Sequence, residues 1–151
     1  NIILLSSTTS ADSEEKCDRR RREIELIKAG KKNTLARLVP HAGFAPENVK
    51  RLQDYIEDIS ELILMTEDEG VIAILGGMIE RQSRGDMLRE SGIPHLFIFG
   101  RHDYYIPEEV AQKMIAEDPT AKVVWLEHSG HMGFIEEPEL CANAILDMIL
   151  K

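Results

Sequence analysis

Two short apolar runs in the second half of the chain have the pattern of buried strands. His95–Phe99 reads HLFIF and ends at Gly100, and Lys122–Glu127 reads KVVWLE before the turn residues His128, Ser129 and Gly130. Short runs rich in β-branched and aromatic residues, closed by turn residues, predict strands. A third strand is predicted over Asn1–Ser7, which reads NIILLSS.

The segment between the two later strands has helical periodicity. Pro107 occupies a first helical position, where its missing N–H costs nothing, and Glu108 and Glu109 favour the first turn. One apolar face follows from the spacing of Val110, Ala111, Met114 and Ile115. Strand, helix and strand at this spacing predict a right-handed βαβ unit with parallel strands.

The rest of the chain predicts further helices. Asp12, with Glu15 three residues later, has the spacing of a capping box, and that helix runs to about Ala29 before Gly30. The mixed stretch Lys31–Pro46 contains a short helix near Thr34–Leu38, broken by Pro40 and Gly43. Three more helices are predicted: from Pro46 to about Met65, over Glu69–Arg84 (extended or restarted at Asp86–Glu90), and over Pro138–Leu150, with Leu140, Ala144, Ile145 and Met148 facing inward.

Length and charge narrow the class of protein. At 151 residues, one domain is expected, and the net charge of −9, from 27 acidic and 18 basic side chains, disfavours a nucleic-acid partner. Arg19–Arg22 lies in a Glu-rich helical stretch, which indicates a solvated face. Cys17 and Cys141 are too few for a disulfide framework or a zinc site. Because the apolar run Ile2–Leu5 is too short for a signal peptide or a membrane span, no membrane contact is expected and a cytoplasmic location is the default. The alternative is an exported parent protein whose signal lies upstream of residue 1.

Two chemically active side chains follow the later strands at matched positions. Asp103 lies four residues beyond the first run and His131 four beyond the second. The carboxyl ends of parallel strands form one sheet edge, where such sheets place their ligands. A carboxylate beside the imidazole would fix its tautomer and stabilise its protonated form. Taken singly, Asp103 is as well explained as a turn former and His131 as a surface residue; the matched placement favours an acid–base dyad.

The motifs around these residues resemble a known family. GRHDYYIP, followed by SGHMGFIEEPE, is similar to the last third of an α/β-hydrolase of the capped, serine-hydrolase type, in which an Asp and the catalytic His follow late strands. The resemblance implies an α/β fold with three parallel strands, the last three of eight. It also implies a core of residues 1–11 and 93–151, with a helical cap and return helix over residues 12–92.

The resemblance also implies an activity. Asp103 and His131 would be two members of a catalytic triad acting on a small ester, lactone or related acyl substrate, without a metal or an organic cofactor. Met132 and Phe134 would line the pocket or pack in the core, and Met65 and Met78 in the cap are further candidates for substrate contact.

The sequence contains no G-x-S-x-G elbow and no HGGG-like stretch to supply a nucleophile and an oxyanion hole. Ser6 and Ser7 end a strand at the correct edge, but they lack flanking glycines, so turn-forming or capping roles are favoured. We therefore expect a C-terminal half whose serine lies upstream, and which is inactive alone. Its expected partners are the missing N-terminal half or a second copy, paired through Asn1–Ser7. The alternative is a non-catalytic binding or assembly module that reuses the half-fold.

Overall fold

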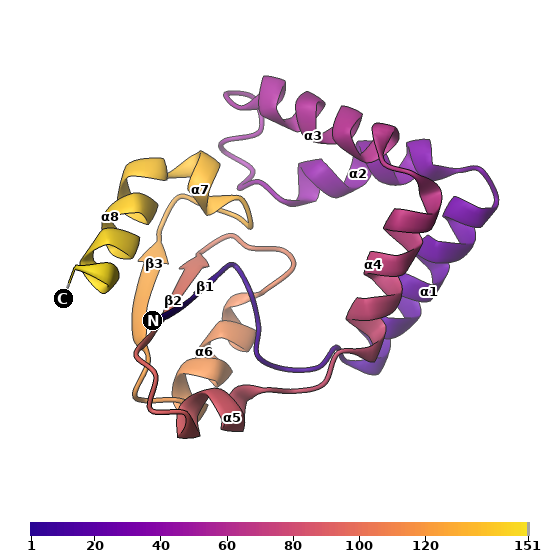
Figure 1. The fold of residues 1–151 in the computed structure, drawn as a ribbon. Helices are drawn as coiled ribbons and strands as arrows, with labels where there is room; N and C mark the ends of the chain where they lie inside the picture. The colour runs from indigo at the N-terminus through magenta and orange to yellow at the C-terminus, as the bar shows by residue number, and fades with distance from the viewer. Residues whose placement is uncertain (151) are drawn as a thin grey trace. The chain divides into compact units, whose positions relative to one another are not determined.

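Three parallel strands form one sheet in the order β1 (Ile2–Leu5), β2 (His95–Gly100), β3 (Lys122–Leu126), as Figure 1 shows. The structure is a computed structural model that describes residues 1–150. In the register, Leu4 pairs with Phe97 and Phe97 with Val123. The predicted α/β architecture with three parallel strands is confirmed.

The central strand β2 is buried at every position, because helices cover both faces of the sheet. Phe97 and Phe99 point to one face, where they pack with α5 (Gly85–Glu90) and α6 (Glu108–Glu117). Leu96 and Ile98 point to the other face and pack with α8 (Pro138–Ile149). This alternation explains why the strand reads as one continuous apolar run.

The helices near the carboxyl end of the chain differ in detail from the predictions. Pro138 occupies the first turn of α8, as expected, but Leu140 is 54% exposed, and the inward position belongs instead to Cys141. Burial raises the pKa of the Cys141 thiol. A short helix, α7 (Gly133–Glu136), was not predicted. Its first residue, Gly133, packs so tightly that an added Cβ would lie 2.4 Å from Leu126 Cδ1.

The chain divides into two compact units. The first contains Asn1–Thr9, Ala42–Leu52 and the chain from Arg84 onward; the second contains Ser10–His41 and Gln53–Ser83. Thus the segment Ala42–Leu52 packs with the sheet. The division into a core of residues 1–11 and 93–151 and a cap of residues 12–92 stays a prediction, and residue 151 lies outside the described part.

The second unit consists of α1 (Glu14–Lys28), α2 (Lys32–Ala42), α3 (Gln53–Met65) and α4 (Asp68–Glu80), with α1 packed beside α4 (Figure 1). The cap of α1 is Ser13, whose hydroxyl accepts from Lys16 N at 3.3 Å, so the prediction of Asp12 was wrong. The buried carboxylate of Asp12 instead forms ion pairs with Arg20 and Arg81, whose side chains are partly exposed. These pairs lower its pKa although burial, the largest single influence, raises it.

Two prolines also behave differently from the predictions. Pro40 lies inside α2 and does not break it. The helix expected from Pro46 begins only at Gln53. Ala45 N and the Asn48 side chain, just before and after Pro46, donate to a distant carboxylate, so long-range hydrogen bonds hold this segment in turns. No helix in residues 1–150 is long and apolar enough to cross a membrane.

Candidate active site

The loops that follow β2 and β3 continue the contact between these strands. Arg101 N donates to Leu126 O at 2.9 Å, and His102 N donates to Ser129 O at 2.9 Å. A Cβ on Gly100 would lie 1.9 Å from Gly130 O, so only glycine fits where the loops meet. This close approach places the residues after each strand side by side.

Asp103 is fixed by the backbone that leads into α6. Its side chain is fully buried, and its Oδ1 accepts from Tyr105 N at 2.8 Å and Ile106 N at 2.9 Å. The residue therefore forms the turn that one interpretation of the sequence assigned to it. Its second oxygen remains directed at another partner, so the turn-forming and dyad roles are compatible.

That partner is His131. The Nδ1 atom of His131 lies 2.9 Å from Asp103 Oδ2, and the histidine side chain is 32% exposed while the aspartate is buried. A carboxylate accepts a hydrogen bond, so it places the proton of a neutral imidazole on Nδ1 and leaves a lone pair on Nε2. The predicted neighbours thus meet with the geometry of a base and its orienting acid.

Further contacts hold the histidine in place. The backbone N–H groups of His131 and Met132 both donate to Gly43 O, at 2.8 and 3.1 Å. The Tyr105 ring meets the imidazole edge-on, with centroids 5.1 Å apart at 70°. The roles of Tyr105 and Gly43 were not predicted. The tyrosine was visible in the DYYIP motif, whereas Gly43 lies almost ninety residues upstream with no local signal.

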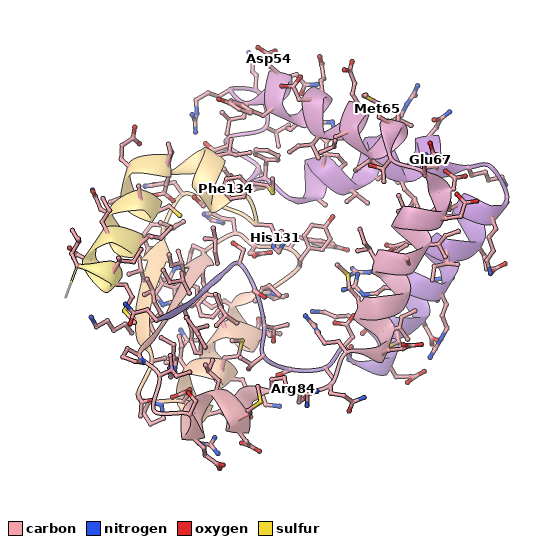
Figure 2. The ribbon with its side chains drawn as sticks, viewed as in Figure 1. Asp54, Met65, Glu67, Arg84, His131 and Phe134 are labelled. Carbon is pink, nitrogen blue, oxygen red and sulfur yellow. The ribbon has the colours of Figure 1, made fainter. Side chains whose placement is uncertain are left out.

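The other predicted site residues fall into two groups. Met132 is half-buried next to His131, and Phe134 on α7 is 50% exposed (Figure 2), so Phe134 is not a core residue. Met65 on α3 is 79% exposed and Met78 on α4 is half-buried; both belong to the second unit. Substrate contact by these four side chains stays a prediction.

Ser6 ends β1 at the same edge of the sheet. It is buried, its φ of +43° lies in the left-handed region, and its hydroxyl has no hydrogen-bond partner among the described residues. A serine in this conformation is strained, and the unpaired buried hydroxyl adds to the cost. The backbone geometry agrees with a turn at Ser6.

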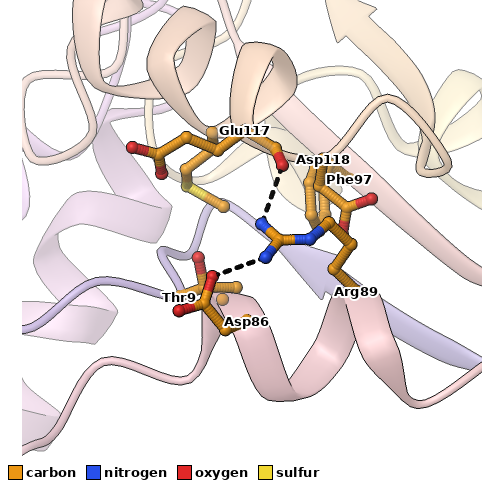
Figure 3. Close-up of a pocket in the computed structure, with 8 residues that line it drawn as sticks. Thr9, Asp86, Arg89, Phe97, Glu117 and Asp118 are labelled. Atoms are coloured by element: carbon orange, nitrogen blue, oxygen red, sulfur yellow. Dashed lines mark hydrogen bonds and ion pairs between the residues drawn. The ribbon is translucent and has the colours of Figure 1, made fainter.

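A separate small cavity lies between α5 and α6 and does not include the dyad (Figure 3). Its volume is about 20 Å³, enough for about one water molecule. Arg89 donates to Glu117 O at 3.1 Å and to Asp86 Oδ1 at 2.8 Å beside it. No group of three or more His, Cys, Asp or Glu side chains within residues 1–150 is arranged to hold a metal ion.

Solved structures share this fold, although no protein-family model and no curated protein matches the chain. A thermophilic esterase from Thermogutta terrifontis matches with a TM-score of 0.86 and 28% identity, over 97% of this chain and 54% of its own. The enol-lactonase from Burkholderia xenovorans matches with a TM-score of 0.84 and 18% identity, over 99% and 55%. An α/β-hydrolase enzyme from a Medee basin deep-sea metagenome library matches with a TM-score of 0.83 and 16% identity, over 99% of this chain and 55% of its own.

These likenesses identify the fold as that of the α/β-hydrolases, and the resemblance drawn from the motifs is confirmed. The chain spans about 55% of the length of the enol-lactonase and of the metagenome enzyme. The named neighbours are enzymes of the α/β-hydrolase superfamily: an esterase, a lactonase and a further hydrolase.

Proposed function

We propose that Asp103 and His131 are the acid and base of a serine-type hydrolase. The observation that carries this proposal is the 2.9 Å contact between His131 Nδ1 and Asp103 Oδ2, which leaves Nε2 free to accept a proton. The partial exposure of His131 supports it, because a base must be reachable by the group that it deprotonates. The shared fold with an esterase and an enol-lactonase supports the reaction class.

In this proposal, His131 Nε2 takes the proton of a serine hydroxyl as the serine oxygen attacks the acyl carbon. The buried Asp103 carboxylate stabilises the imidazolium that forms. As the tetrahedral intermediate collapses, the proton passes from Nε2 to the leaving oxygen, and the acyl group stays on the serine. Water, deprotonated by the same nitrogen, then releases the acid and restores the enzyme.

The nucleophile in this proposal lies outside the 151 residues, because these contain no G-x-S-x-G elbow. The chain by itself is then expected to show no turnover of activated esters beyond a histidine-dependent background. A stoichiometric acyl adduct on any serine of the chain, detected by mass spectrometry, would contradict this part of the proposal.

The proposed substrate is a small ester, lactone or related acyl compound, and no metal or organic cofactor takes part. Met132 and Phe134 are proposed to contact the substrate, since they flank His131 and are partly or largely exposed. Met65 and Met78 are proposed as further contacts from the helical unit. Each is tested by its alanine variant, for which a raised KM with unchanged kcat is expected.

The second candidate function is a non-catalytic binding or assembly module. The absence of a nucleophile motif favours it, whereas the dyad geometry is unexplained by it. The coding sequence upstream of residue 1 discriminates between the two. A nucleophile elbow encoded in frame supports the hydrolase, and its absence supports the module.

A further inference from the structure

Glu136 is a buried carboxylate on α7 whose two oxygens both accept hydrogen bonds. The residue is 5% exposed. Its Oε1 accepts from Gly130 N at 2.7 Å, and its Oε2 accepts from Ala45 N at 2.7 Å and from the Asn48 side-chain amide at 2.9 Å. Its donors therefore belong to two loops more than eighty residues apart in the sequence.

One of these loops carries the histidine of the dyad. Gly130 directly precedes His131, and the backbone N–H of His131 donates to Gly43 O in the other loop. The loops touch so closely that a Cβ on Gly130 would lie 2.8 Å from Ala45 N and from Gly43 O. Glu136 thus holds together the two backbone segments that fix the position of the His131 backbone.

The preceding turn is held by the next carboxylate. Glu137 Oε2 accepts from His128 N at 2.9 Å and from the Ser129 hydroxyl at 2.6 Å. Consecutive glutamates therefore hold consecutive parts of the loop from His128 to Gly130. The Asn48 amide also donates to His128 O at 2.6 Å, so Asn48 contacts both Glu136 and the loop from His128 to Gly130.

An amide cannot replace the carboxylate at position 136. Both oxygens face N–H donors, so a glutamine would direct its NH₂ group at one of them whichever way it rotated. A buried donor left without an acceptor costs about 1–3 kcal/mol, which corresponds to roughly a 5- to 150-fold change in an equilibrium. In the glutamine variant, the open state of the loop from His128 to Gly130 would be populated roughly 5- to 150-fold more.

We infer that Glu136 is a positioning residue for His131: it fixes the loop that holds the imidazole against Asp103. This inference rests on the proposed function for its catalytic meaning, since Glu136 itself does not touch the reacting atoms. Its structural part, the control of the His131 ring by a carboxylate five residues later, is measurable without turnover.

The experiment uses the ¹⁵N-labelled chain and its variants Glu136→Gln and Asn48→Ala, with Glu139→Gln as the matched control. Glu139 is exposed and three residues from Glu136. Amide exchange at Gly130 and His131 is compared with exchange at Leu96–Ile98 in the buried strand. The ring nitrogen signals of His131 report the Nδ1–H bond to Asp103.

In Glu136→Gln, exchange at Gly130 and His131 is expected to accelerate roughly 5- to 150-fold, and the ring signals to move toward those of a free imidazole. The strand amides are expected to stay unchanged. Asn48→Ala removes one donor and is expected to act in the same direction with a smaller effect, so it decides the question if the glutamine variant does not fold. Glu139→Gln is expected to match the wild type.

The inference is overturned if a folded Glu136→Gln or Asn48→Ala variant loses stability while the His131 ring signals stay as in the wild type. Glu136 would then be structural only. Failure of the proposed function has a different signature: His131→Ala would retain turnover in the complete enzyme, whatever the ring signals of these variants show.

Discussion

Replacement of Asp103 by asparagine separates the orienting role of this residue from its structural role. In the folded chain, Oδ1 accepts from Tyr105 N and Ile106 N, and Oδ2 faces His131 Nδ1. The amide oxygen of the introduced asparagine is expected to stay at the Oδ1 position. The flipped amide would leave two buried N–H donors without acceptors, at about 1–3 kcal/mol each.

The NH₂ group of the asparagine then faces His131 Nδ1 and must donate to it. Neutral imidazole carries one proton, so this proton moves to Nε2, where the proposed base needs its lone pair. A tautomer error of this kind costs about 10⁴-fold in kcat in the Ser-His-Asp template, which corresponds to about 5 kcal/mol of transition-state stabilisation. The free energy of unfolding is expected to fall by only about 1–2 kcal/mol, because the turn to α6 keeps its acceptor.

Two assays measure these effects. Long-range ¹H–¹⁵N spectra of the neutral His131 ring are expected to show the Nδ1–H tautomer in the wild type and the Nε2–H tautomer in Asp103→Asn. Ester hydrolysis by the complete enzyme is expected to lose about four orders of magnitude in kcat. Asp86→Asn, an exposed aspartate paired with Arg89, is the matched control. An unchanged tautomer, or turnover within tenfold of the wild type, would show that Asp103 does not orient His131 for catalysis.

Three further predictions concern other parts of the fold. Ser6→Gly is expected to raise the free energy of unfolding, measured in urea, by about 1 kcal/mol. The change removes an unpaired buried hydroxyl and the strain of a serine with positive φ, and these gains exceed the larger backbone entropy that glycine loses on folding. A lower free energy of unfolding would contradict this prediction. Burial raises the pKa of Asp118, but hydrogen bonds from Thr120 and His95 outweigh this effect and lower the pKa below its ordinary value near 3.8. The Asp118 carboxylate therefore stabilises the folded chain fully above pH 3.8, and this stabilisation is lost as the pH falls through the lower pKa of the folded state. The melting temperatures of the wild type and Asp118→Asn should therefore converge at low pH, and a constant difference from pH 7 to pH 2 would count against this. Finally, the outer edge of β1 pairs with no strand of residues 1–150, so light scattering at micromolar concentration is expected to show self-association of the chain. A monomer with slow amide exchange throughout Ile2–Leu5 would contradict this prediction.

The strands and the contact between Asp103 and His131 could be predicted because their signals are local. The strand β2 is buried on both faces, so its positions Leu96–Phe99 are all apolar, and this continuous pattern indicates the burial directly. Asp103 lies three residues beyond the end of β2 and His131 five beyond the end of β3, not four each as the sequence indicated. Both still follow parallel strands whose carboxyl ends form one edge of the sheet, and this brings them together.

The errors arose where distant residues decide the local structure. The turns between Ala42 and Gln53 replace the helix expected from Pro46, since Ala45 and Asn48 donate to Glu136 across the fold. Nothing in the local pattern reports a partner so far away. Similarly, Asp12 lies at the spacing of a helix N-cap, but its carboxylate forms ion pairs with Arg20 and Arg81. Ser13 is therefore the residue that caps α1.

The proposed role of His131 as the base of a hydrolase is tested by the effect of removing its side chain on ester hydrolysis. The protein is expressed from its full open reading frame, and kcat/KM for a short-chain p-nitrophenyl ester is compared for the wild type, His131→Ala and His128→Ala. His128 is the matched control because it is an exposed histidine of the same loop, and its ring contacts Glu47 at the surface. We expect His131→Ala to lose at least about 10³-fold and His128→Ala to stay within about threefold of the wild type. Equal activity of the wild type and His131→Ala would contradict the account.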